Sequence, residues 1–229
     1  MTPQAWQKQL RAAFEPLANA KKAGEMQAYM KSSLPYYGLP LKDGRRMMKE
    51  LAKPLTFASF SEFDAFVRHV YATAKFREEK YAALSLLDLK QTRPFQTLEA
   101  VPLYEWLIVT GAWWDLVDEV ATHRFEPLLE REPAAIKRVL LGWSKGGDLW
   151  LRRTAIICQV LRHEHTDLEL LFATIEPAIG EKDFFLRKAI GWGLRAAGRW
   201  KPKEVRAWLT KNGERLAGLS RREAEKAFA

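Results

Sequence analysis

The chain has a single cysteine, Cys158, among its 229 residues. One cysteine excludes an intramolecular disulfide and a zinc site built from several cysteines. The surrounding stretch, Thr154-Ala-Ile-Ile-Cys-Gln-Val-Leu161, has the composition of a buried helical face. We therefore expect a structural thiol at this position and not a nucleophile.

Long hydrophobic runs are also missing. No uncharged apolar stretch reaches the roughly 18 residues that a membrane-spanning helix needs. The first 20 residues are amphipathic and carry internal charges, unlike a signal peptide. These absences predict a cytoplasmic protein without a membrane partner.

The familiar catalytic and cofactor motifs are absent. The sequence contains no Gly-x-Gly-x-x-Gly, P-loop, Gly-x-Ser-x-Gly or His-Glu-x-x-His pattern. The four histidines are scattered, and the two-residue spacing of His163 and His165 does not place both on one helical face. We therefore expect no metal, no nucleotide cofactor and no serine-hydrolase chemistry.

Positive charge, in contrast, is abundant. Lysine and arginine exceed aspartate and glutamate by enough to give a formal net charge of +9. A basic surface favours polyanions such as nucleic acid or an anionic membrane face. Simple solubility is the alternative explanation, so charge alone leaves the partner open.

Apolar residues recur every three or four positions along almost the whole chain, as in Leu84, Leu87, Leu103, Trp106 and Leu107. This spacing predicts helices, and proline and glycine separate them. The expected helices cover residues 3–18, 22–33, 43–53, 60–74, 78–89, 98–109, 113–130, 133–144, 149–163, 167–179, 184–199 and 203–215.

Helix start signals support this pattern. Ser59 precedes an apolar stripe, and Asp148 and Asp183 each stand before an aromatic-containing helix, where aspartate suits the N-cap. No strand-like alternation lasts long enough to build a sheet. The sequence thus predicts an all-α fold.

A repeat points to the architecture. Asp148-Leu-Trp-Leu-Arg-Arg-Thr-Ala-Ile156 aligns with Asp183-Phe-Phe-Leu-Arg-Lys-Ala-Ile190 at an offset of 35 residues, and the same step backwards reaches Trp113. A period of roughly 35–45 residues is typical of an α-solenoid of HEAT-like helix pairs. We expect a single domain over residues 1–229, a monomer, in which these repeats line a concave basic groove.

Trp114 and Asp118 are the first candidate site residues. They are four positions apart and share a helical face. An indole beside a carboxylate suits a cationic ligand. An isolated pair of this kind is more often a core tryptophan next to a solvated aspartate.

Arg152 and Arg153 lie one repeat further along. An arginine there can hold a carboxylate in place or clamp a phosphate with two hydrogen bonds. A solvent-exposed basic pair is the alternative.

The stretch that follows Asp183 interleaves aromatic and basic residues, a pattern that suits a sugar-phosphate backbone. The candidate DNA-binding residues in it are Phe184, Phe185, Arg187, Lys188 and Arg195. Gly191 and Gly193 flank Trp192, although glycine is a poor helix former. They allow close approach of another backbone, either a neighbouring helix or a ligand strand.

Four stretches together resemble the AlkD family of bacterial DNA alkylation repair glycosylases, which are built from HEAT-like repeats. They are Tyr29-Met30-Lys31, Trp113-Trp-Asp-x-Val-Asp118, Trp150-Leu-Arg-Arg-Thr-Ala-Ile156 and Arg187-Lys-Ala-Ile-Gly-Trp-x-Leu-Arg195. Each is weak alone, but they spread over most of the chain in the family's order.

The resemblance implies the site and the reaction. It assigns the active cleft to Trp114, Asp118, Arg153 and Trp192, none of which is substituted, and a DNA contact to Tyr29. It implies hydrolysis of the N-glycosidic bond of cationic N3- and N7-alkylpurines, such as 3-methyladenine and 7-methylguanine, in double-stranded DNA. No cofactor is implied, and a nucleoid-associated location follows from the substrate.

Two other interpretations remain. A non-catalytic HEAT-like repeat protein could bind a protein partner in its concave face, as helical repeats commonly do. A second non-enzyme could bind DNA structures without releasing a base. The basic charge argues against the first, and the four intact site positions argue against the second.

Overall fold

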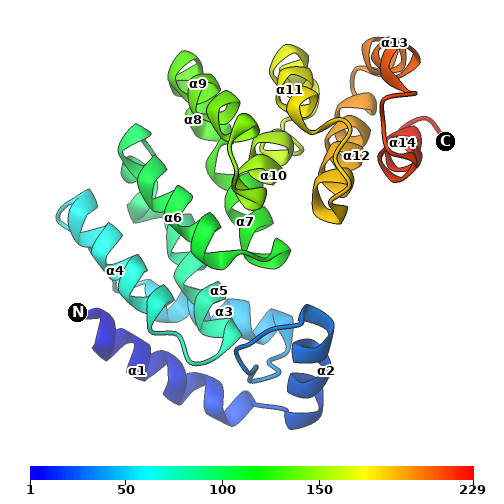
Figure 1. Cartoon of the computed structure of the whole chain (residues 1–229). Helices are drawn as coiled ribbons and strands as arrows, with labels where there is room; N and C mark the ends of the chain where they lie inside the picture. Colours follow the sequence, from blue (N-terminus) through cyan, green and yellow to red (C-terminus); the bar gives the residue numbers. More distant parts are fainter. The chain divides into compact units, whose positions relative to one another are not determined.

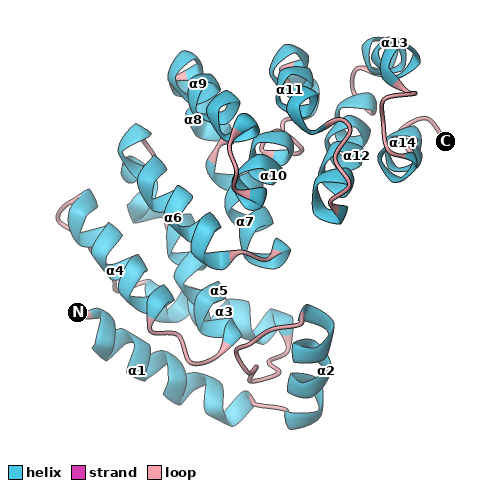
Figure 2. Ribbon diagram, in the orientation of Figure 1, coloured by secondary structure: helices cyan, strands magenta, loops and turns pink.

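The computed structural model describes residues 1–229 except for the side chain of Leu41, and this described part contains helices and no strand (Figure 2). The predicted all-α class is confirmed. No helix within it is long and apolar enough to span a bilayer. The α-helices are α1 (Pro3–Phe14), α2 (Ala20–Met30), α3 (Leu41–Ala52), α4 (Phe60–Ala72), α5 (Arg77–Ser85), α6 (Val101–Gly111), α7 (Trp114–Arg124), α8 (Glu126–Arg131), α9 (Pro133–Lys145), α10 (Leu149–Ile157), α11 (Leu168–Ile175), α12 (Phe184–Gly198), α13 (Pro202–Asn212) and α14 (Gly218–Glu225). The 3-10 helices are η1 (Glu15–Leu17), η2 (Leu86–Asp88), η3 (Lys90–Phe95), η4 (Leu98–Ala100), η5 (His163–His165) and η6 (Glu176–Ala178).

The chain divides into two compact units, Met1–Leu103 and Tyr104–Ala229. Each has its own buried apolar residues. The expectation of one domain over residues 1–229 stays a prediction.

In the first unit, two buried glutamates at the start of α5 fix the segment between α2 and α3. Glu78 accepts hydrogen bonds from the backbone N–H groups of Tyr37 (3.0 Å) and Gly38 (2.9 Å). Glu79, fully buried, accepts from Arg11 at 2.9 and 3.0 Å. Gly38 has a φ of +77°, which only glycine adopts readily. These hydrogen bonds and the positive φ of Gly38 fix the non-helical conformation of the proline- and glycine-containing segment between α2 and α3.

The second unit is a stack of helix pairs. α7 contacts α10, α10 contacts α12 and α12 contacts α14, so these four helices form one row (Figure 1). α9 and α11 contact each other beside this row, and α13 packs against α12. The predicted stacking of helix pairs is confirmed in this unit, which carries the repeat.

Two aspartates cap the repeated helices as predicted. The Asp148 carboxylate accepts from the N–H groups of the second and third residues of α10, both at 2.9 Å. Asp183 makes the equivalent contacts at 2.7 and 3.0 Å to α12. Each cap satisfies backbone donors that the helix leaves unpaired, and so fixes where the helix starts.

The aromatic residues at these helix starts pack on one another. Ring centroids of Trp113 and Trp150 are 6.2 Å apart, those of Trp113 and Phe185 5.4 Å, and those of Trp150 and Phe185 4.9 Å. The first-turn aromatics of three successive repeats therefore converge in one cluster. They hold α7, α10 and α12 in register.

Two expected helices were wrong in extent, and one helix was missed. The helix expected over 113–130 breaks between α7 and α8, because Pro127 has no N–H to continue the helix and stands in the first turn of α8. The helix expected over 149–163 ends at Ile157. α14 was not predicted at all.

α14 explains one of the two glycines around Trp192. A Cβ on Gly191 would lie 2.4 Å from the Cβ of Glu223 and 3.0 Å from the carbonyl oxygen of Ser220, both on α14. A Cβ on Gly193 would lie 3.3 Å from the carbonyl oxygen of Ile156 on α10. Of the two explanations left open by the sequence, close approach of neighbouring helices holds at both positions.

Replacing Gly191 with alanine is expected to lower the free energy of unfolding by about 1–3 kcal/mol, because α14 must shift to make room. Gly142, in α9, is the control, since a Cβ there would meet nothing within 4 Å. Gly142→Ala should stabilise by roughly 0.5–1 kcal/mol, the helix-propensity gain. Urea denaturation of both variants measures the difference. Equal effects would mean that α14 does not pack against Gly191.

Candidate functional site

The centre of the candidate site is an ion pair between α7 and α10. Arg153 donates from Nε to Oδ1 of Asp118 at 2.8 Å and from Nη2 to Oδ2 at 2.7 Å. This two-point contact fixes both the position and the plane of the carboxylate. The partners are 35 residues apart, one repeat of the sequence.

Arg153 also reaches the next repeat. Its Nη1 donates to the carbonyl oxygen of Phe185, in the first turn of α12, at 2.7 Å. One buried guanidinium therefore connects α7, α10 and α12. The sequence proposed two uses for Arg153, holding a carboxylate or clamping a phosphate, and in this structure it holds a carboxylate.

Asp118 is mostly shielded from solvent, with 17% of its side chain exposed, against 7% for Arg153. Burial raises the pKa of Asp118, the hydrogen bonds and charge of Arg153 oppose that shift, and nearby Asp115 adds to it. The Arg153 contact is what favours a carboxylate over a carboxylic acid at this mostly buried position. The site thus presents one oriented, partly desolvated negative charge.

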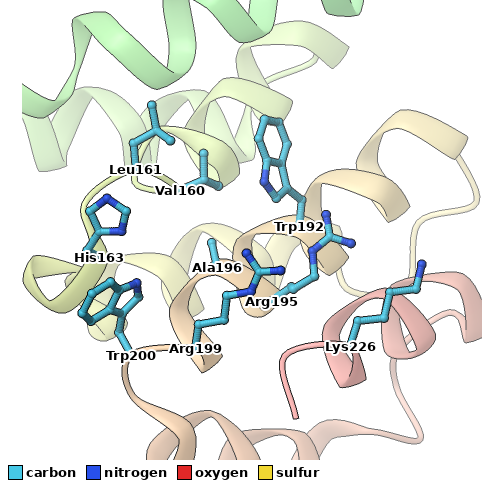
Figure 3. Close-up of a pocket in the computed structure, with 9 residues that line it drawn as sticks. All are labelled: Val160, Leu161, His163, Trp192, Arg195, Ala196, Arg199, Trp200 and Lys226. Carbon is cyan, nitrogen blue, oxygen red and sulfur yellow. The ribbon is translucent and has the colours of Figure 1, made fainter. Parts of the chain in front are cut away.

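The two candidate tryptophans lie on different helices of the same unit. Trp114 is the first residue of α7, one turn before Asp118, and is half-buried. Trp192, also half-buried, stands in the middle of α12 between its two glycines. Trp192 forms part of the wall of a cavity of about 570 Å³ (Figure 3).

The candidate basic residues differ in what they contact. Arg152 donates to Glu181 at 2.7 Å, so its charge is partly compensated within the protein. Lys188 and Arg195 both pair with Glu223 of α14. The hydrogen bond from Lys226, and after it that from Lys188, lowers the pKa of Glu223 to about 2, against the opposing effect of burial.

The remaining candidates differ in their exposure. Phe184 is 52% exposed, whereas Phe185 belongs to the aromatic cluster at the helix starts. Arg187 is half-buried, and its Nε donates to the backbone oxygen of Asp183 at 3.3 Å. Tyr29 is 73% exposed and belongs to the first unit, whereas the other candidates belong to the second.

Four residues around Trp192 were missed by sequence reasoning. Arg199, Trp200, His163 and Lys226 line the same cavity as Trp192 (Figure 3). Arg199 and Trp200 carried a usable signal, because an aromatic residue flanked by basic ones is typical of nucleic-acid contacts. Lys226 follows α14, and nothing in the sequence pattern placed it beside α12.

Comparison with known families decides the wider identity. The family model described as DNA alkylation repair enzyme matches residues 10–228. The chain belongs to the DNA alkylation repair enzyme family. That membership gives the protein a role in DNA repair and indicates DNA as its partner.

A solved structure of the same type supports the assignment. It is described as a "predicted DNA alkylation repair enzyme" from Enterococcus faecalis, is 26% identical and superposes with a TM-score of 0.82. The match covers 93% of this chain and 97% of that one. Among curated proteins, none matches this chain.

Proposed function

We propose that this DNA alkylation repair protein is a DNA glycosylase of the AlkD type, acting on cationic N3- and N7-alkylpurines in double-stranded DNA. The observation that carries the proposal is the buried two-point ion pair between Asp118 and Arg153. It gives a carboxylate a fixed direction in a partly desolvated site, which is what stabilisation of a developing positive charge requires.

The substrate class follows from the chemistry of the leaving group. Alkylation at N3 or N7 makes the purine cationic, so it departs as a neutral base and needs little help from a general acid. The remaining problem is the positive charge that develops on the deoxyribose. Asp118 stabilises that oxocarbenium-like state and positions or deprotonates the water that attacks C1′.

The residues around Asp118 have supporting roles in this proposal. Arg153 orients the carboxylate and keeps it ionised. Trp114 and Trp192 offer indole faces for C–H/π and cation–π contacts with the lesion nucleotide, each worth roughly 0.5–2 kcal/mol depending on desolvation. No cofactor or metal is part of the proposal.

DNA binding is assigned to exposed and basic groups. Arg187, Lys188 and Arg195 of α12 hold phosphates, and the exposed rings of Tyr29 and Phe184 contact the backbone. Binding of this kind releases counterions, so the affinity should fall steeply with salt.

The direct test is release of 7-methylguanine and 3-methyladenine from methylated duplex DNA by the full chain, followed by chromatography of the free bases. Release above the uncatalysed rate supports the proposal. DNA binding without release would replace it with a non-enzymatic binder of DNA structures. Absence of DNA binding would favour the protein-binding adaptor.

The acid side of the pH profile gives a further test. Because burial raises the pKa of Asp118, base release should disappear at a higher pH than the pKa of an ordinary aspartate. Below that pKa the protonated group carries no charge and the rate falls with pH; above it the rate is flat.

Arg153→Gln removes a cation that lowers the pKa of Asp118, so the acid limb of the profile should move to higher pH. Single-turnover rates with the uncatalysed loss subtracted measure it, and an unmoved limb would remove Asp118 as the titrating group.

A further inference from the structure

The cavity beside Trp192, here named the α12 pocket, combines aromatic and cationic side chains from separate segments. Six of its lining residues carry polar or aromatic groups: His163, Trp192, Arg195, Arg199, Trp200 and Lys226. Its volume of about 570 Å³ lies in the range of small-molecule sites, roughly 300–1,000 Å³. The pocket has room for a single nucleotide.

The aromatic wall is held in place by the η5 turn. His163 has a φ of +53°, unusual for a residue with a side chain, and its ring lies 5.0 Å from that of Trp200, tilted by 59°. The Thr166 hydroxyl donates to the His163 carbonyl oxygen, and Lys201 Nζ donates to that of Thr166, both at 2.8 Å. Strained backbone of this kind persists only where the surroundings fix it. Trp200 nevertheless stays 50% exposed, so its ring has free surface.

The charge of the pocket has one sign. Arg195, Arg199 and Lys226 line it, and no acidic residue does. Glu223 pairs with Arg195 and Lys226 from outside the lining. Arg199 is solvent-exposed and forms no ion pair in the described part of the chain, so its guanidinium is available to an anion.

We propose that the α12 pocket binds one unpaired nucleotide of a DNA strand, with its base stacked on Trp200 and its phosphate held by Arg199 and Arg195 (Figure 3). Stacking on an indole needs a base whose face is open, and a base inside a duplex is covered by its neighbours. The cations supply the contact to the phosphate. The inference rests on DNA as the partner and needs no base release.

The test uses undamaged duplexes, so that binding is measured without the proposed reaction. Fluorescence anisotropy compares the full chain on a fully paired duplex, on the same duplex with one bulged nucleotide, and on that bulge with a baseless deoxyribose analogue. We expect the bulged duplex to bind about tenfold more tightly than the paired one, and the baseless bulge to lose most of that gain. Equal affinity for the bulge with and without its base would overturn the stacking proposal.

Variants assign the effect to the pocket. Trp200→Ala should abolish the preference for the bulge, while Trp200→Phe, which keeps a stacking face, should retain most of it. Arg199→Gln should weaken binding of the bulged duplex several-fold. Arg222→Gln removes an exposed charge outside the pocket, and it should leave the preference for the bulged over the paired duplex unchanged. A preference that survives Trp200→Ala would overturn the site.

The two proposals can fail separately. Base release from alkylated paired DNA without any preference for the bulge would overturn the nucleotide pocket and leave the glycosylase. A preference for the bulge without base release would overturn the glycosylase and leave the nucleotide pocket.

Discussion

Asp118→Asn is expected to slow release of 7-methylguanine from methylated duplex DNA by at least about a hundredfold, with the Kd for DNA changed by less than about twofold. The size follows from removing a preorganised charge from the place where opposite charge develops, which costs on the order of 10²–10³ in rate. Asparagine keeps the shape and can still accept a hydrogen bond from Arg153, so the fold should persist. Binding is preserved because it depends on cations elsewhere on the unit.

The control lies on the same helix. Asp115, three residues before Asp118, contributes to the same local potential and lacks the contact with Arg153. Asp115→Asn makes the same chemical change and should lower the rate by less than about fivefold, because it removes a neighbouring charge that the proposed mechanism does not place at the reacting sugar. Single-turnover release and anisotropy are measured side by side for both variants. Full activity of Asp118→Asn would remove Asp118 from the mechanism.

Arg153→Ala is expected to lower the free energy of unfolding by about 3 kcal/mol, in addition to reducing base release. Removing one partner of a buried ion pair leaves the other without compensation, and Asp118 is only 17% exposed. The contact with the Phe185 carbonyl oxygen is lost as well, so that oxygen loses a charged donor. Urea denaturation measures the stability, and release of 7-methylguanine measures the activity.

A variant of the neighbouring Arg152 tests whether the effect of Arg153→Ala comes only from a general loss of positive charge. Arg152 pairs with Glu181, and these two side chains are 16% and 40% exposed, against 7% and 17% for Arg153 and Asp118, so solvent screens this pair more. Arg152→Ala should therefore cost less than about 1 kcal/mol. In the double variant Asp118→Asn/Arg153→Ala the two losses of stability should not add, since both remove the same interaction. Equal effects of Arg152→Ala and Arg153→Ala, or additive losses, would contradict a specific role for the Asp118 pair.

Several features were accessible from the sequence because they depend on local rules. Asp148 and Asp183 cap helices because a carboxylate just before a helix accepts from its first free N–H groups. The 35-residue repeat placed one carboxylate and one arginine a full period apart, and equal spacing in a stack brings such positions to neighbouring helices. The pair between Asp118 and Arg153 follows that spacing.

Other features depend on segments that carry no such pattern. The α14 helix is short and polar, with few apolar positions to mark a helical period. It packs against α12 at Gly191, where the missing side chain lets the two helices approach closely. Because α14 was not foreseen, neither was the pairing of Lys188 and Arg195 with Glu223. The α12 pocket likewise combines α12, the η5 turn and the segment after α14.

The sequence by itself determined the all-α class, the stacking of helix pairs and the residues that would meet across one repeat, because periodicity and capping act over a few residues and a repeat copies them at a fixed distance. Only the tertiary structure decided that Arg153 also binds the Phe185 carbonyl oxygen, that the glycines around Trp192 allow neighbouring helices to approach, and that Trp200 and Arg199 share a pocket. Those outcomes depend on packing between segments far apart in the chain, where volume and charge compensation, and not local preference, set which side chains meet.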